Sequence, residues 1–195
     1  MTPTPSAASA ARRTSDPYAL QAEAFPAPGF TLSSDDVGAD GTLPSACYAR
    51  GGGLSPALSW TGLPPEAASL LITAFDADSP VPGGFWHWLL LDVPASAGGL
   101  PTGAGSRGGA LPAGSRSWRN DLGSTGYCGV NPPPGTGTHR LFLAATALDV
   151  PHLDVPAAAS AAMVHVLAIP HTVARAVLVA TSTAPRSQQD TGNEE

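Results

Sequence analysis

Residues 69–93 have the sequence SLLITAFDADSPVPGGFWHWLLLDV, and this stretch decides the fold. Two apolar runs flank a loop rich in Pro and Gly, as is typical of two buried β-strands joined by a turn. In the second run, residues 85–93, both sets of alternating positions are mainly apolar. The pattern therefore predicts a strand inside a sandwich, covered on both faces, with His87 on the face of Leu89 and Leu91.

Three ionisable side chains stand at the edges of the loop between these two strands. Asp76 and Asp78 follow the first apolar run, and His87 lies between two tryptophans in the second. A buried polar group without a partner costs about 1–3 kcal/mol, so such residues need a role. We expect them to line a small pocket.

Composition indicates a single, mostly β domain. The chain has 195 residues, of which 43% are hydrophobic, and this is enough for one domain with a core. Its 22 Gly and 21 Pro favour short strands and turns over long helices. Further strands are expected at residues 30–33, 58–60, 70–75, 138–148 and 173–181, and one helix at 157–168. The strand at 58–60 is expected to be an edge strand.

The charge of the chain and the composition of its termini argue against several classes of protein. The formal charge is −6 and the nine basic residues, all Arg, are scattered, so no nucleic-acid partner is expected. No apolar run is long enough for a transmembrane helix. Residues 1–24 lack the apolar region of a secretory signal and are predicted to be a disordered leader, and residues 183–195 a disordered acidic tail. Residues 25–182 remain as the folded domain.

The two cysteines favour a reducing compartment. Cys47 and Cys128 are too few for a disulfide framework and lack metal-ligand spacing. We expect both to be reduced in the cytoplasm.

A second histidine repeats the arrangement around the first. His87 and His139 each begin a buried strand beside a Gly- and Pro-rich loop, and strand starts can converge at one end of a sandwich. Two imidazoles, with backbone N–H groups of residues 129–131, can hold an anion. In the predicted mechanism a protonated His139 contacts the anion, His87 forms the opposite wall, and Asp76 orients one imidazole.

Six short motifs occur in an order that resembles a known family. They are LSPALSWTGLPPEAASL (54–70), FDADSP (75–80), HW (87–88), NDLG (120–123), YCGVNPPPGTGTHR (127–140) and AMVHVLA (162–168). Over residues 25–180 they resemble the phosphatidylethanolamine-binding protein family, which includes the Raf kinase inhibitor protein, and especially its bacterial branch.

The resemblance implies a fold and a site. The fold is all-β dominated, a sandwich of two antiparallel sheets with one or a few peripheral helices. The site is a small pocket for phosphate-like anions, including the head group of phosphatidylethanolamine. Carried over to this chain, its ligand-binding residues are Asp76, Asp78, Pro80, His87, Tyr127, Gly129, Asn131, Pro132, Pro133 and His139.

Several positions depart from the family pattern. Ala77 replaces a proline and Ser79 an alanine, and Asn131 stands where a glycine is common. Leu141 replaces an aromatic residue, and Ala176 falls at the position of a tyrosine that helps close the pocket in relatives. Loss of two phenolic hydroxyls implies a less polar site.

Three classes of function remain open. The first is non-enzymatic binding of a phospholipid head group or phosphorylated metabolite, with no catalytic residue, cofactor or metal, since no G-x-S-x-G nucleophile motif is present. The second is a kinase-inhibitor-like interaction protein that uses the same loops with an unidentified partner. The third is a two-His-one-Asp metal enzyme. The resemblance also allows a homodimer.

Overall fold

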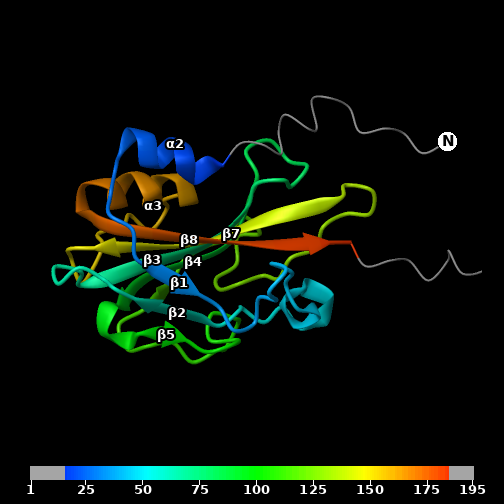
Figure 1. The fold of residues 1–195 in the computed structure, drawn as a ribbon, viewed down its shortest axis with the longest axis horizontal. Coiled ribbons are helices and arrows are strands. Elements are labelled where there is room, and N and C mark those ends of the chain that lie inside the picture. The colour runs from blue at the N-terminus through cyan, green and yellow to red at the C-terminus, as the bar shows by residue number, and fades with distance from the viewer. Residues whose placement is uncertain (1–15, 185–195) are drawn as a thin grey trace, which may run out of the picture.

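The computed structural model describes residues 16–184, which form two antiparallel sheets and a layer of helices (Figure 1). The smaller sheet has the order β1 (Thr31–Ser33), β2 (Leu58–Thr61), β5 (Gly99–Leu100). The larger sheet has the order β6 (Arg116–Ser117), β4 (Phe85–Pro94), β3 (Ser69–Asp76), β7 (Thr138–Leu148), β8 (Thr172–Thr183). The helices are α2 (Pro17–Ala24), α3 (Ala161–Ala168) and the short 3₁₀ helices η1 (Ser45–Cys47), η2 (Ala49–Gly51), η3 (Ala95–Ala97) and η4 (Ile169–His171).

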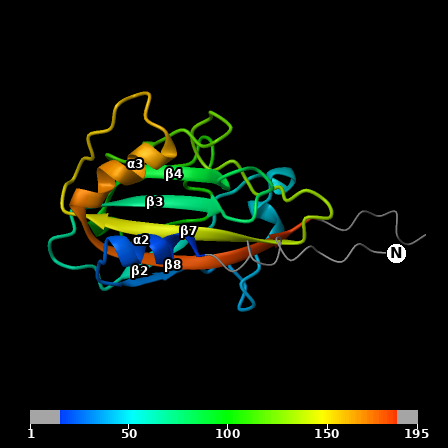
Figure 2. The ribbon, with the colours of Figure 1, turned by 90° about the horizontal axis from the view of Figure 1, so that it is seen from above.

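The five-stranded sheet is the middle layer of the molecule. Figure 1 shows the three-stranded sheet on one of its faces and helices α2 and α3 on the other, and Figure 2 shows the two helices side by side. The inner face packs against the small sheet through Ile72, Trp88 and Leu143, among others. The outer face packs against α3 through Leu71, Leu89 and Leu91, among others. Strand β3 is therefore buried at all its residues, as the two-faced apolar pattern predicts.

Two irregularities in β4 change which faces its side chains occupy. Ala74 of β3 pairs with Trp88, but the next residue, Phe75, pairs with Trp86, which leaves His87 as an extra residue in a β-bulge. The bulge reverses the alternation, so the prediction that His87 shares the face of Leu89 and Leu91 is wrong. Those two leucines face α3, whereas His87 contacts residues at the other side of the sheet.

The second irregularity in β4 lies at Asp92, whose φ of 60° is the left-handed conformation. Its buried carboxylate accepts hydrogen bonds from the side chain of Arg116 and the backbone N–H of Leu153, and lies 2.8 Å from His152 Nδ1. This cluster ties the loop after β7 to the sheet. No motif in the sequence indicates a role for Asp92 or His152.

Helix α2 corrects the prediction that all of residues 1–24 are disordered. Asp16 caps the helix by accepting hydrogen bonds from the N–H groups of Tyr18 and Ala19, and Pro17 occupies its first turn. Tyr18 is buried against Phe142 of β7, and its hydroxyl lies 3.1 Å from Thr73 Oγ1. The Asp-Pro pair is a helix-start signal that the composition argument overlooked. The predicted disorder of residues 1–15 and 185–195 lies outside the described residues.

Three smaller predictions also differ from the structure. Strand β2 is the middle strand of the small sheet, not an edge strand, because both β1 and β5 pair with it. Helix α3 begins at Ala161 instead of residue 157, since Ser160 caps it by accepting from the N–H of Met163. Strand β8 continues to Thr183, inside the predicted tail. The predicted strand at 138–148 agrees with β7 at both ends.

The docking of α2 through Tyr18 can be tested by truncation. Tyr18→Ala should lower the free energy of unfolding by about 3 kcal/mol, because it removes a buried aromatic ring. Leu20→Ala on the same helix, whose side chain is 68% exposed, should change it by less than about 0.5 kcal/mol. Urea unfolding measures both, and equal effects would contradict the docking of α2.

Candidate functional site

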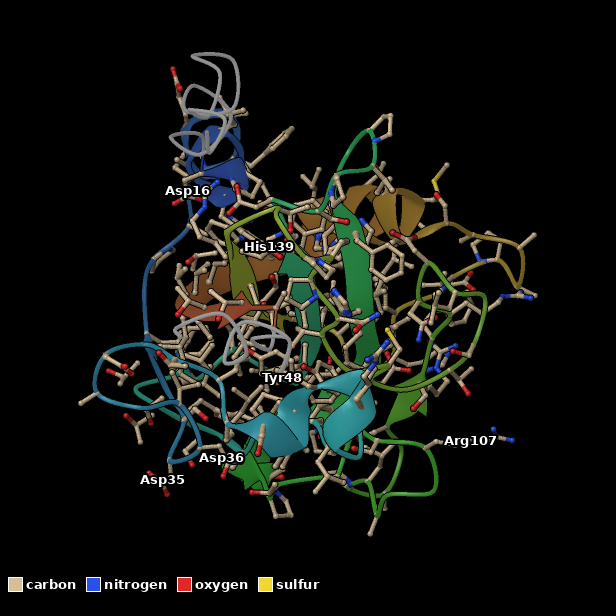
Figure 3. The ribbon with its side chains drawn as sticks, turned by 90° about the vertical axis from the view of Figure 1, so that its right-hand side faces the viewer. Asp16, Asp35, Asp36, Tyr48, Arg107 and His139 are labelled. Atoms are coloured by element: carbon tan, nitrogen blue, oxygen red, sulfur yellow. The ribbon has the colours of Figure 1, made fainter. Side chains whose placement is uncertain are left out.

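Strand order brings the two predicted histidines to either side of one carboxylate. Strand β3 lies between β4 and β7 and runs antiparallel to both, so its last residue, Asp76, meets the first residues of its neighbours. His87 enters from β4 and His139 from β7. Figure 3 looks onto this end of the molecule and shows His139 there, with Tyr48 beside the short helices.

The contact between Asp76 and His139 is the closest of these interactions. Asp76 Oδ2 lies 2.8 Å from His139 Nδ1, and both residues are buried. The other ring nitrogen, Nε2, lies 2.8 Å from Thr136 Oγ1, whose hydroxyl donates to the carbonyl of Pro133. The single hydroxyl hydrogen of Thr136 is used in that hydrogen bond, so the contact with Thr136 Oγ1 requires His139 Nε2 to donate. In this geometry His139 donates at both ring nitrogens, as an imidazolium does. The buried pair of Asp76 and His139 then has no net charge.

His87 is held differently and has one ring nitrogen left for a ligand. Its Nδ1 donates to the carbonyl of Gly129 at 2.9 Å, because a carbonyl can only accept. Burial lowers the pKa of His87 below its ordinary value of 6.5, although the carboxylate of Asp76 acts in the opposite direction. His87 is therefore neutral at pH 7, and its Nε2, 4.0 Å from Asp76 Oδ2, is a hydrogen-bond acceptor.

A cavity of about 320 Å³ opens at this end of the sandwich. Eight of the ten predicted site residues line it: Asp76, Pro80, His87, Gly129, Asn131, Pro132, Pro133 and His139. The other lining residues are Ala49, Ser79, Val81, Phe85, Leu122 and Cys128. Most of the wall is apolar, and its charged groups are the Asp76–His139 pair.

Asp78 was predicted as a ligand-binding residue but is not among those lining the cavity. Its carboxylate pairs with Arg140, accepting from Nε at 2.8 Å, from Nη2 at 2.9 Å and from the backbone N–H at 2.9 Å. Burial alone would raise the pKa of Asp78, but the hydrogen bonds from Arg140 outweigh it and lower that pKa. The role of Asp78 is to join the loop after β3 to the start of β7.

Tyr127 was likewise predicted in the site and lies behind the cavity wall. Its hydroxyl donates to the carbonyl of Cys47, and its ring packs edge-on against Trp88 in the core. Burial raises the pKa of Tyr127, so it stays neutral. It supports the ring of His87, 6.4 Å away between centroids, and makes no part of the lining.

The two positions where the family has aromatic residues also lie outside the lining. Leu141 is buried in the core between the sheets. Ala176 pairs with Ala145 in the middle of β8, whereas the residue of β8 opposite His139 is Ser182. The assignment of Ala176 to a pocket-closing position is therefore wrong, because the register places it six residues along the strand from the cavity.

Sequence reasoning missed much of the apolar lining. Phe85 stacks on His87 with ring centroids 4.8 Å apart, and its position next to the Pro-Gly loop was an available signal. Val81 and Leu122 stand at the cavity with exposed fractions of 43% and 67%. Leu122 belongs to the NDLG motif, whose Asn, Asp and Gly residues indicate only a turn. Large exposed apolar side chains in two loops cannot be assigned to one cavity from sequence spacing.

The metal-enzyme alternative receives no support from this geometry. Asp76, His87 and His139 do meet, but His139 Nδ1 is taken by the carboxylate and Nε2 by Thr136. Within residues 16–184, no group of three or more His, Cys, Asp or Glu side chains is arranged to hold a metal ion.

Gly129 is required for this arrangement of the site. Its φ of 74° is left-handed, and a Cβ there would lie 2.5 Å from the backbone nitrogen of Ala49. The same residue presents its carbonyl to His87. A side chain at this position would therefore move the acceptor that orients the His87 ring.

Comparison with known proteins identifies the family. The family model described as phosphatidylethanolamine-binding protein matches residues 33–183. YbhB of Escherichia coli, a UPF0098 protein, is 40% identical over 130 residues, which are 67% of this chain and 82% of YbhB. YbcL of the same organism is 33% identical over 148 residues, 75% of this chain and 81% of YbcL. The chain belongs to the phosphatidylethanolamine-binding protein family.

Solved structures agree with this conclusion. The crystal structure of E. coli YbcL, described as a new member of the mammalian PEBP family, has a TM-score of 0.75 at 30% identity and covers 80% of this chain and 99% of YbcL. A PEBP homologue of Chlamydia trachomatis, CT736, has a TM-score of 0.70 at 26% identity, over 82% of this chain and all of CT736. These likenesses confirm the predicted sandwich of two antiparallel sheets.

Two observations bear on location. None of the helices within residues 16–184 is long and apolar enough to cross a bilayer. A relative in Mycobacterium tuberculosis, 34% identical over 119 residues, is named a putative lipoprotein, LppC.

The requirement for glycine at residue 129 can be separated from ordinary backbone strain. Gly129→Ala and Gly123→Ala both place an alanine at a φ near 75°, which should each cost about 1–2 kcal/mol. Only Gly129→Ala forces a close contact, since a Cβ at Gly123 meets no atom within 4 Å. Gly129→Ala should thus lose about 1–3 kcal/mol more in urea unfolding and shift the His87 ring signals in NMR spectra. Equal losses with unmoved His87 signals would contradict the tight packing of Gly129.

Proposed function

We propose that this protein binds small phosphate-like anions, such as a phospholipid head group or a phosphorylated metabolite, in the cavity at Asp76, His87 and His139. The observation that carries the proposal is the position of His87, whose Nε2 stands 4.0 Å from Asp76 Oδ2 in a cavity lined by Gly129 and Asn131. A singly protonated phosphate has both a hydroxyl to donate and charged oxygens to accept, so it matches such a mixed site.

The donors for the anion come from the Gly-Pro loop. In the part of the chain that the structure describes, the backbone N–H groups of Gly129 and Asn131 make no backbone hydrogen bond. The Asn131 side chain adds an amide donor to the lining. His139 supports binding indirectly, because its charge offsets that of Asp76 and its nitrogens are already engaged. This assigns the direct contact to His87, in place of the His139 contact predicted from sequence.

The apolar rim suggests the rest of the ligand. Val81, Phe85 and Leu122 line the cavity, and two of them have exposed apolar surface at its opening. A ligand with a phosphomonoester head and an apolar body would place the head near His87 and its carbon chain against this rim. Rigid Pro132 and Pro133 form a wall that needs no ordering upon binding.

Several aspects of this role stay predictions. Burial raises the pKa of the Cys128 thiol to about 11, so Cys128 is not a thiolate nucleophile at neutral pH. This is consistent with binding without catalysis. Three further expectations also remain predictions. They are the regulation of a kinase or another partner through the same loops, the formation of a homodimer, and a cytoplasmic location. Both cysteines are free, with Cys47 fully buried.

Replacement of His87 tests the direct contact. His87→Phe keeps a ring against Phe85 but removes Nε2, and should weaken phosphoethanolamine binding about tenfold to hundredfold in an NMR titration. His171→Phe, at a half-exposed histidine paired with Asp149 outside the cavity, is the matched control and should bind normally. Normal binding by His87→Phe would overturn the proposed contact.

The protonation state of the anion supplies an independent test. Phosphoethanolamine should bind more weakly as the pH rises from about 5.5 to about 8, because its P–OH, with a pKa of about 6, is lost. Sulfate, which carries no proton in this range, should bind more weakly than phosphoethanolamine at the acidic end, because burial lowers the pKa of His87 and a neutral His87 Nε2 can only accept. Equal affinity for sulfate and phosphoethanolamine at pH 7, or a flat pH profile, would count against the acceptor role of His87.

A further inference from the structure

A second cavity lies on the opposite, helix-covered face of the five-stranded sheet. Its volume is about 190 Å³, and it is lined by Pro17, Tyr18, Gln21, Phe75, Trp86 and His165. Helix α2 supplies the first three of these residues and α3 supplies His165, and Figure 2 shows both helices lying over the sheet. The cavity has no lining residue in common with the one at Asp76.

The β-bulge at His87 creates the floor of this second cavity. Because Phe75 pairs with Trp86 after the register shift, both rings lie on the outer face, with centroids 4.4 Å apart. Trp86 also stacks on His165, with centroids 4.6 Å apart. Apolar cavities of about 150 Å³ hold benzene, so this aromatic cavity has room for one planar ring.

His165 lines the cavity and has one polar atom without a hydrogen-bond partner in the described part of the chain. Its Nε2 is buried and has no hydrogen-bond partner among residues 16–184. No ligand role for this residue follows from the sequence. Burial, together with the charge of Arg175, lowers the pKa of His165 to about 4, so the ring is neutral at pH 7. A buried donor or acceptor left unpaired is costly, and a bound ligand that completes the hydrogen bond recovers part of that cost.

Arg175 of β8 adds a positive charge beneath the helices. It is 9% exposed, and its Nε and Nη2 are buried without a hydrogen-bond partner in the described part of the chain. Burial lowers the pKa of its guanidinium, against a contribution from Tyr18, yet the group stays charged at pH 7. The titratable groups around this cavity are thus Arg175 from β8, Tyr18 from α2 and the α2 cap Asp16, whose carboxylate acts on Tyr18. Arg175 is the charge that acts on His165, so the field at that ring favours a negative ligand.

We propose that this cavity is a second binding site, for a small aromatic carboxylate, independent of the anion site at Asp76. The ring of the ligand lies against Phe75 and Trp86. Its carboxylate accepts a hydrogen bond from His165 Nε2–H in the field of Arg175. Helix α2, capped by Asp16 and held through Tyr18, closes the site from above.

Benzoate is the probe that tests this site, with benzamide as its uncharged counterpart of the same shape. In an NMR titration of the full chain at pH 7, benzoate should bind saturably at millimolar concentration, shift the Trp86 indole and His165 ring signals, and raise the pKa of His165. Benzamide should bind at least tenfold more weakly. Absence of saturable shifts with benzoate, or equal binding of benzamide, would overturn the proposal.

Two substitutions separate the polar groups from the aromatic walls. His165→Phe retains the stacked ring, and Arg175→Met replaces a buried unpaired charge with an apolar chain of similar length, a change that buried sites tolerate. Each should weaken benzoate binding at least tenfold while phosphoethanolamine binding at the first cavity stays unchanged. Benzoate binding that survives both substitutions would contradict the proposal, as would benzoate shifts confined to His87.

Discussion

The buried contact between Asp76 and His139 is the interaction on which the first site depends. A carboxylate that is 5% exposed at the end of a central strand is tolerable only with hydrogen-bond donors around it. His139 supplies one across the β3–β7 pair, and the backbone N–H of Asp78 supplies another. Removal of either partner leaves the other buried and unpaired, which is strongly destabilising. Asp76 also positions the loop after β3, because its carboxylate accepts from the N–H of Asp78, and Asp78 in turn binds Arg140 at the start of β7.

The single extra residue in β4, His87, decides which side chains of this strand lie on each face of the sheet. Without the bulge at His87, strict alternation would place Trp86 on the face of Trp88, inside the sandwich. The bulge instead gives His87 to the cavity at Asp76 and turns Trp86 towards α3 and His165. The cavity at Asp76 and the aromatic cavity therefore share one backbone irregularity, although their linings are separate. Bulges occur often at functional sites for this reason, since they redirect a side chain without breaking the sheet.

Sequence alone could predict the sandwich and most of the polar residues that line the cavity at Asp76. The long strands have apolar residues on both faces, so residues 138–148 were predicted with the bounds of β7. His87 and His139 could be paired because each begins a strand, and antiparallel order brings such ends together. The face of His87 could not be predicted, because a bulge depends on the register between two strands. Asp78 does not line the cavity, because its carboxylate pairs with Arg140, 62 residues away in the sequence. Tyr127 does not line it either, since a motif does not tell which of its members turn inward. Helix α2 was missed because Tyr18 alone supplies its buried contact.

The protonation of the two histidine rings tests the central claim most directly. Long-range ¹H–¹⁵N correlation spectra of the imidazoles at pH 7 distinguish protonated from unprotonated ring nitrogens. The account predicts that His139 is protonated at both nitrogens, and that His87 is protonated at Nδ1 and bare at Nε2. A bare nitrogen on His139, or a proton on Nε2 of a neutral His87, would contradict the arrangement in which Asp76 holds the first ring and leaves the second for a ligand.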